Sequence, residues 1–109
     1  MDLNIFTHKS RAAVAGARAE AERLDHPQAE PAHLLSSLLG QGDGIAYPLL
    51  DRLSIDPAAL KRGLAERLAS IPRVFGDAEV GFSPDLVSIL EQADAERRAM
   101  KDDYVSVEH

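Results

Sequence analysis

The sequence has 109 residues, no cysteine and a formal net charge of −6, with 45% hydrophobic and 28% charged residues. This composition fits one small globular domain, and the lack of cysteine excludes disulfides, thiolate metal sites and cysteine nucleophiles. No apolar run reaches the roughly 18 residues of a membrane span, the first residues lack a secretory-signal pattern, and the negative charge argues against general nucleic-acid binding. We therefore expect a cytoplasmic protein without a nucleic-acid or membrane partner.

Four helices are predicted in the first part of the chain, at positions 1–70. Thr7 is a good N-cap for a helix from His8 to Leu24, and small apolar residues recur along it at helical spacing. These residues are Ala13, Val14, Ala17 and Ala21, and their small size lets a neighbouring helix approach closely. Three shorter helices are predicted at residues 31–39, 45–53 and 57–69, with turns rich in glycine or proline between them.

The helical pattern lapses at residues 71–81, where Pro72, Gly76 and Gly81 indicate a linker. Ser83-Pro84-Asp85 then combines an N-cap, a first-turn proline and an acid near the positive end of the helix dipole. This combination predicts a helix that reaches Met100, followed by an extended segment at residues 104–106.

One stretch of sequence occurs twice. Residues 6–33 and 82–109 have the same length and align position for position without a gap. The matched pairs include Phe6 with Phe82, Thr7 with Ser83, Ala17 with Ala93, Glu20 with Glu96 and His33 with His109. Such a long period predicts duplicated helical units that bury their apolar faces against each other. It divides the chain into a first repeat at residues 1–70, a linker at 71–81 and the start of a second repeat at 82–109.

The first copy continues after its histidine with L-L-S-S-L-L, and the second copy has no such continuation. We therefore expect a truncated second repeat and about five or six helices in all. An incomplete repeat would leave the faces around Leu86, Ile89 and Leu90 uncovered, so both a monomer and a self-associating dimer remain open.

Several motifs carry a family resemblance. They are F-T-H-K-S at 6–10, E-P-A-H-L-L-S-S-L-L at 30–39, D-G-I-A-Y-P-L-L at 43–50, I-P-R-V-F-G at 71–76, F-S-P-D-L at 82–86 and D-D-Y-V-S-V-E-H at 102–109. With these motifs in order, the chain resembles the N-terminal domains of the Clp chaperone ATPases, most closely those of the ClpB disaggregases. The resemblance implies an all-α, Clp N-domain-like, pseudo-duplicated helical bundle that is attached flexibly to AAA+ modules.

The resemblance also implies a function. In ClpB proteins the domain helps to receive unfolded or aggregated client proteins, which a hexameric AAA+ ring threads through its pore. ATP and Mg²⁺ would belong to those modules, so this part is expected to be no enzyme and to hold no cofactor or metal. Thr7, Asp102 and Glu108 match positions implicated in client handling, and Leu90 matches part of an apolar groove. Gln92 and Glu96 stand where some relatives carry groove leucines.

Two alternatives remain open. In the ClpC type, paired glutamates before the two histidines bind phosphoarginine in an adaptor or degron; Glu108 fits this role and Ala32 does not. The chain could also be a stand-alone Clp-N-like protein.

Each candidate residue also has a purely structural interpretation. Thr7 and Ser83 are good helix caps, and Asp102 and Glu108 could serve only the electrostatics of helix ends. The histidine spacings match no compact zinc pattern, so His33 and His109 are expected to pack at helix starts against a neighbouring helix. Acids in and around the linker, Asp77 among them, accompany no recognisable catalytic triad.

Overall fold

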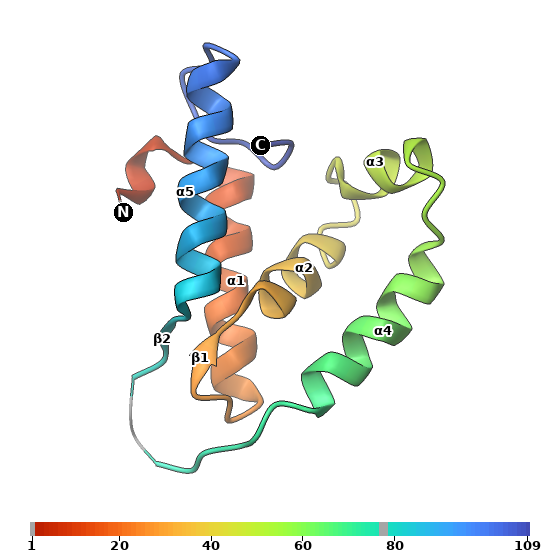
Figure 1. Cartoon of the computed structure of the whole chain (residues 1–109), viewed down its shortest axis with the longest axis vertical. Coiled ribbons are helices and arrows are strands. Elements are labelled where there is room, and N and C mark those ends of the chain that lie inside the picture. The colour runs from red at the N-terminus through yellow and green to blue at the C-terminus, as the bar shows by residue number, and fades with distance from the viewer. Residues whose placement is uncertain (1, 77–78) are drawn as a thin grey trace.

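The computed structural model describes residues 2–76 and 79–109, and these residues form five α-helices. The helices are α1 (His8–Arg23), α2 (Pro31–Leu39), α3 (Ala46–Arg52), α4 (Pro57–Ala69) and α5 (Pro84–Ala99) (Figure 1). A short 3-10 helix, Leu3–Ile5, precedes α1, and two very short strands, β1 (Gln28–Ala29) and β2 (Gly81–Phe82), pair in parallel. The all-α class is confirmed; the two short strands were not predicted.

Four of the five described helices, α1, α2, α4 and α5, begin where the sequence supplies a cap or a proline. Thr7 Oγ1 accepts a hydrogen bond from the Ser10 amide at 3.2 Å, and Ser83 Oγ accepts one from the Leu86 amide at 3.1 Å. Proline occupies the start of α2, α4 and α5, where its missing amide hydrogen would have no partner in any case. Local chemistry thus explains why the predicted helix limits lie close to the observed ones: α1 ends at Arg23 rather than Leu24.

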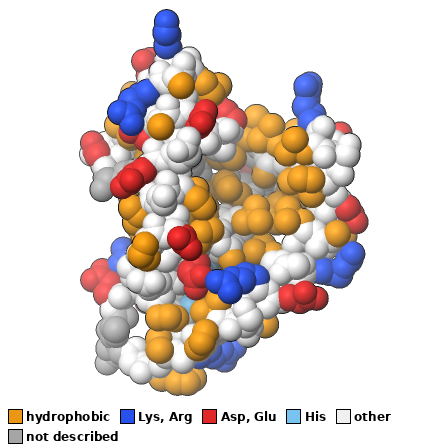
Figure 2. Space-filling model, viewed as in Figure 1, with side chains coloured by type: hydrophobic (Ala, Val, Ile, Leu, Met, Phe, Trp, Pro, Cys, Tyr) orange, Lys and Arg blue, Asp and Glu red, His pale blue; other side chains and the backbone are white. Residues whose placement is uncertain are grey.

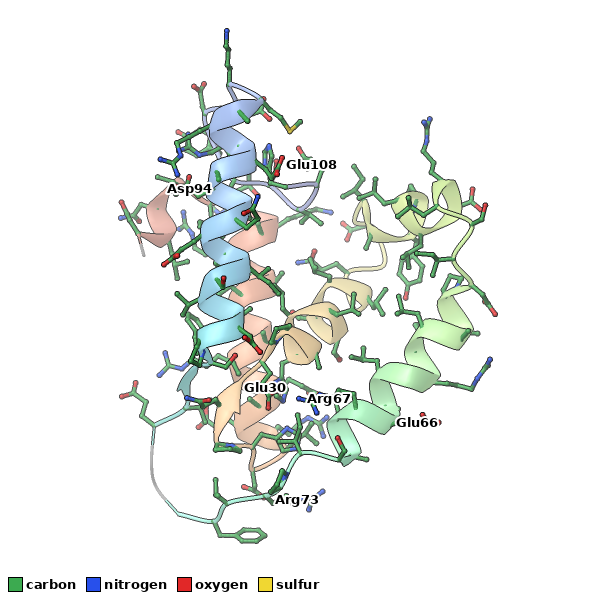
Figure 3. All side chains as sticks on the ribbon, viewed as in Figure 1. Glu30, Glu66, Arg67, Arg73, Asp94 and Glu108 are labelled. Atoms are coloured by element: carbon green, nitrogen blue, oxygen red, sulfur yellow. The ribbon has the colours of Figure 1, made fainter. Side chains whose placement is uncertain are left out.

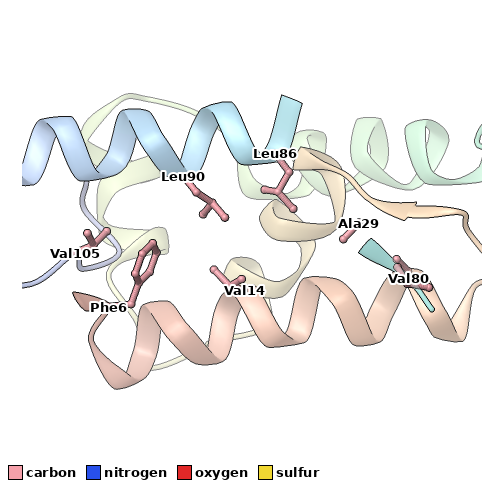
Figure 4. Packing of buried hydrophobic residues seen from close by; sticks show 8 residues of the cluster. Phe6, Val14, Ala29, Val80, Leu86, Leu90 and Val105 are labelled. Carbon is pink, nitrogen blue, oxygen red and sulfur yellow. The ribbon is translucent and has the colours of Figure 1, made fainter. Parts of the chain in front are cut away.

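The core lies between α1 and α5, which run antiparallel (Figure 1). Leu86 and Leu90 of α5 point towards Val14 of α1, and Phe6 and Val105 close one end of the cluster (Figure 4). Leu86 is 0% and Leu90 4% exposed. The expectation that the face of α5 around these two residues would be uncovered was therefore wrong. The two residues lie four apart on one side of α5, and that side meets α1; only Ile89, on the adjacent side, is 45% exposed.

The two aligned stretches adopt the same local geometry. Helices α1 and α5 start and end at equivalent positions, and the residue two beyond each helix, Asp25 or Lys101, has a left-handed backbone with φ of 58° or 60°. Equivalent backbone hydrogen bonds also join the two stretches to each other. The Thr7 amide donates to the Val105 carbonyl at 2.9 Å, and the equivalent Ser83 amide donates to the Ala29 carbonyl at 2.9 Å. The start of each stretch is therefore fastened to the end of the other. The division into residues 1–70, 71–81 and 82–109 stays a prediction.

Helix α2 packs closely on α1 because the facing residues are small. A Cβ atom added to Gly16 would collide with Ser37 Oγ of α2, and Ala13 and Ala17 of α1 are 1% and 0% exposed. The close approach predicted from the small side chains of this helix is thus present.

Helices α3 and α4, which we call the α3–α4 arm, extend from α2 away from the core (Figure 1). None of the residues of these two helices, all of which the structure describes, is fully buried. The arm is anchored by half-buried leucines of α4 and by an ion pair of 2.9 Å between Arg67 and Glu30 (Figure 3). Hydrophobic side chains gather on the face between α5 and the arm (Figure 2). Within the described ranges, no helix has the length and apolar character that crossing a membrane requires.

Candidate functional site

The last residues of the described chain lie over the start of α1. Val105 forms an isolated parallel bridge with Phe6, its amide donates to the Ile5 carbonyl at 2.8 Å, and its carbonyl accepts from Ser10 Oγ at 2.6 Å. The Ser10 hydroxyl is buried, so this bond holds the C-terminal segment from inside the protein. The segment 106–109 is thereby fixed beside Thr7, which is far away in the sequence.

Thr7 and Glu108 line one shallow pocket, together with Lys9, Asp43 and Ile45. Thr7 is half-buried because its hydroxyl caps α1, while Glu108 is exposed on the C-terminal segment (Figure 3). Lys9 Nζ lies 3.0 Å from Asp43 Oδ2 and closes the side of the pocket formed by the turn before α3. The fold therefore brings together two of the four predicted site residues.

Glu108 carries a full negative charge at neutral pH. Ser106 Oγ donates to Glu108 Oε1 at 2.6 Å, and this bond lowers the pKa of the Glu108 carboxyl below its ordinary value. A hydrogen bond from its own backbone lowers the pKa further, and partial burial opposes the shift. The pocket thus has a fixed anionic group at its rim.

An apolar groove adjoins this pocket and shares Ser106 and Val107 with it. Its volume is about 140 Å³, and α1, α2, α5 and the C-terminal segment all contribute to it. The apolar side chains that line the groove are Phe6, Ala13, Val14, Leu34, Leu38, Ile89, Leu90, Ala93, Val105 and Val107. Leu90, the third predicted site residue, lies on the floor and is 4% exposed, whereas Ile89 is 45% exposed.

Asp102, the fourth predicted residue, does not line either cavity. Its Oδ2 atom lies 2.7 Å from His109 Nε2, and the Ser106 amide donates to His109 Nδ1 at 2.9 Å. Asp102 therefore positions the histidine ring, which in turn forms part of the groove wall. The structure places Thr7 and Glu108 together, puts Leu90 in the neighbouring groove, and joins Asp102 to it only through His109.

The groove occupies a surface of α5 whose counterpart on α1 is covered. Positions Ala13, Gly16 and Ala17 of α1 lie under α2. The equivalent residues of α5 are Ile89, Gln92 and Ala93; Ile89 and Gln92 are exposed and Ala93 is half-buried. No helix within the described part of the chain covers this surface of α5 as α2 covers α1. Gln92 Nε2 bonds to Glu96 Oε1 at 3.1 Å, so the far edge of the surface is polar.

Residue-based reasoning missed Ile89 as a site residue, and it missed the contribution of Leu34 and Leu38 from α2. The alignment of the two stretches carries a signal for Ile89, because it pairs this large side chain with the small Ala13. No comparable signal exists for the two leucines, since only the tertiary contact of α2 brings them to the groove.

The remaining candidates are the histidines, the possible metal ligands and the glutamates of a phosphoarginine site. His33 is 0% exposed and packs at the start of α2 as expected. Among residues 2–76 and 79–109, no group of three or more potential ligands is placed to hold a metal ion. Asp77, one of the acids considered, lies outside the described residues. Ala32 and Glu108 occupy equivalent positions, so only one of the two glutamates expected of a phosphoarginine site is present.

Residues 5–109 match the protein family described as the Clp repeat (R) N-terminal domain. The chaperone protein ClpB of Bacillus cereus is 36% identical over 113 aligned residues, which cover 100% of this chain and 13% of that protein. ClpB of Pseudomonas putida is 35% identical, and the match covers 99% of this chain and 13% of that protein. The chain thus spans a small part of the curated relatives that it matches.

Solved N-domains have the same fold. The Hsp104 N-terminal domain from Candida albicans gives a TM-score of 0.83 at 22% identity, over 93% of this chain and 67% of that one. The N-domain of ClpV from Vibrio cholerae gives 0.83 at 19% identity, over 94% and 61%. A complex of the ClpV N-domain with a VipB peptide gives 0.80 at 19% identity, over 94% and 62%.

Proposed function

Because this chain belongs to the Clp repeat N-terminal domain family, we propose that it is the client-binding N-terminal domain of a ClpB-like chaperone. In this proposal it is a non-enzymatic module that engages exposed apolar segments of unfolded or aggregated proteins. AAA+ modules of the same protein, with their ATP and Mg²⁺, would then thread those clients.

One observation carries the proposal: apolar side chains of α1, α2, α5 and the C-terminal segment line one groove, and Ile89 in its wall is 45% exposed. An apolar client segment that enters the groove would gain contacts of the kind that α2 makes with α1. Apolar burial is non-directional and contributes roughly 25 cal/mol per Å², which suits a module that must accept many different sequences. The ClpV N-domain, which has the same fold, has been solved with a bound peptide, and this supports peptide binding by such a domain.

The acidic rim should give the groove a preference for clients with basic residues. Glu108 is ionised next to the groove entrance, and Asp102 and Glu96 lie exposed around the same end of α5. We expect clients in which lysine or arginine flanks the apolar segment to bind more tightly, and we expect this preference to weaken as salt screens it.

The experiment is a fluorescence anisotropy titration of the domain with a permanently unfolded protein, reduced and carboxymethylated lactalbumin. Ile89→Asp places a charge in the groove wall and should weaken binding by about tenfold or more. Leu53→Asp is the matched control, because Leu53 is 67% exposed at the end of α3 and does not line the groove. Equal binding by the two variants would overturn the assignment to the groove.

A second comparison separates the rim from the groove. Glu108→Ala removes the ionised carboxylate from the rim and leaves the Thr7 cap of α1 in place. We expect this variant to lose salt-dependent binding and to retain part of the apolar binding. ATP hydrolysis by the purified domain above the buffer level would contradict the non-enzymatic proposal.

A further inference from the structure

Two buried histidines connect the end of α1 to the start of α2. His26 is 4% and His33 0% exposed, and His26 Nδ1 lies 2.7 Å from His33 Nε2. The rings meet edge to face, with centroids 5.0 Å apart. His26 follows the left-handed turn at Asp25, and His33 stands in the first turn of α2, so this side-chain bond links the end of α1 directly to the start of α2.

The hydrogen bonds determine where the protons of both neutral rings lie. The Glu30 amide donates to His33 Nδ1 at 2.8 Å, so this nitrogen carries no hydrogen. The hydrogen of His33 is therefore on Nε2 and is donated to His26 Nδ1, which leaves the hydrogen of His26 on its own Nε2. A further proton on either acceptor nitrogen removes one of these two bonds.

The surroundings of His33 disfavour such a proton. Burial lowers the pKa of His33 most strongly, and the neighbouring His26 lowers it as well. Glu30 and Glu20 raise this pKa by smaller amounts, and both are already paired, Glu30 with Arg67 and Glu20 with Arg23, each at 2.9 Å. Around His26, the cavity walls hold the carboxylates of Glu22, Asp25 and Glu79 and the guanidinium groups of Arg23 and Arg73.

The second half of the molecule contains the same arrangement with one substitution. Asp102 is equivalent to His26, and its carboxylate lies 2.7 Å from His109 Nε2, while the Ser106 amide donates to His109 Nδ1 as Glu30 does to His33. A carboxylate remains a good partner for a histidine that gains a proton, whereas a second histidine does not. Two equivalent connections are thus built to respond differently to acid.

We propose that the His26–His33 pair is an acid-sensitive latch, which releases α2 and the α3–α4 arm from α1 when the pH falls. His33 of the unfolded or opened chain binds a proton near the ordinary histidine value of about 6.5, and in the latched state it binds this proton only at lower pH. Stability is therefore complete above about 6.5 and declines below it. The opening equilibrium then rises by up to about tenfold per pH unit for each proton taken up.

The released surface would be apolar. Helix α2 covers Ala13 and Ala17, and the arm touches the rest of the protein chiefly through α2. Opening of the latch would therefore expose the surface of α1 that corresponds to the open surface of α5, and it would free the arm as one piece.

Amide hydrogen exchange measured by NMR between about pH 7.5 and 5.5, on either side of the ordinary histidine value, tests the latch, with rates converted to protection factors at each pH. We expect the protection of α2 amides to fall with acidification and that of α5 amides to stay constant. His8→Gln is the control, because His8 is exposed and should leave the pH dependence unchanged. Constant protection of α2 across this range in the wild-type protein would overturn the proposal.

Exchanging the partners gives an independent test. His26→Asp gives His33 the partner that His109 has, and it should flatten the pH dependence of α2. Asp102→His gives His109 the partner that His33 has, and it should create acid sensitivity in the C-terminal segment. Asp102 is 45% exposed, so this second variant is expected to fold even if the first does not. A segment that stays insensitive to acid in Asp102→His would contradict the role of the histidine pair.

Discussion

Ala13 and Ile89 occupy the same position in the two halves of this fold, yet Ala13 is 1% exposed and Ile89 is 45% exposed. The difference arises because α2 lies on α1 and no described helix lies on the matching surface of α5. Substitutions at the two positions should consequently affect stability in different ways.

We predict that Ile89→Ala changes the free energy of unfolding by less than about 1 kcal/mol, since half of the side chain is already in water. Ala13→Leu should destabilise the protein by about 1–3 kcal/mol, because the added atoms have no room beneath α2. Urea denaturation followed by circular dichroism measures both values. Equal losses at the two sites would show that the surface of α5 is not open in solution.

Two helical glycines should respond differently to alanine. Gly63 lies on α4 with nothing within 4 Å of an added Cβ, so Gly63→Ala should stabilise the protein by about 0.5–1 kcal/mol. Gly16→Ala should lose that gain, because its Cβ forces the Ser37 hydroxyl to rotate. Gly16→Leu should destabilise by about 1–3 kcal/mol or more. Thermal unfolding curves of the three variants provide the comparison, and a stabilising Gly16→Leu would contradict the close packing of α1 and α2.

The Ser106 hydroxyl holds the pKa of Glu108 below its ordinary value of 4.5. We predict that Ser106→Ala raises this pKa towards the ordinary value, as followed by the carboxyl ¹³C shift in an NMR titration. A carboxyl with a lowered pKa stabilises the fold above its unfolded value and loses that contribution as the pH falls through the folded value. Ser106→Ala should therefore weaken the acid dependence of stability below about pH 4.5. Ser70→Ala, which removes a distant exposed hydroxyl, is the control.

The cap of α5 should contribute measurably to stability. Ser83 is 6% exposed and its hydroxyl accepts from the Leu86 amide, so Ser83→Ala should cost about 1 kcal/mol or more. Ser88 lies exposed inside the same helix, and Ser88→Ala should be neutral or slightly stabilising because alanine is the better helix former. Chemical denaturation of the pair gives the difference, and equal stability of the two variants would rule out a contribution from the cap.

The positions of the helix ends follow from local sequence. Caps, first-turn prolines and the spacing of small apolar residues act within a few neighbouring positions, so Thr7, Ser83 and the prolines could be interpreted without a structure. The duplication of residues 6–33 at 82–109 was equally visible, since finding it needs only a comparison of letters.

Which of these residues share a site depends on tertiary contacts. Leu90 and Ile89 are neighbours in one helix, but the position of α1 buries the first and leaves half of the second exposed. Thr7 meets Glu108 because Val105 pairs with Phe6, and His26 bonds to His33 because a left-handed turn brings the chain back against α1. Each of these contacts joins segments through packing and hydrogen bonds that local periodicity does not encode, because helical spacing states which residues share a face and not what covers that face.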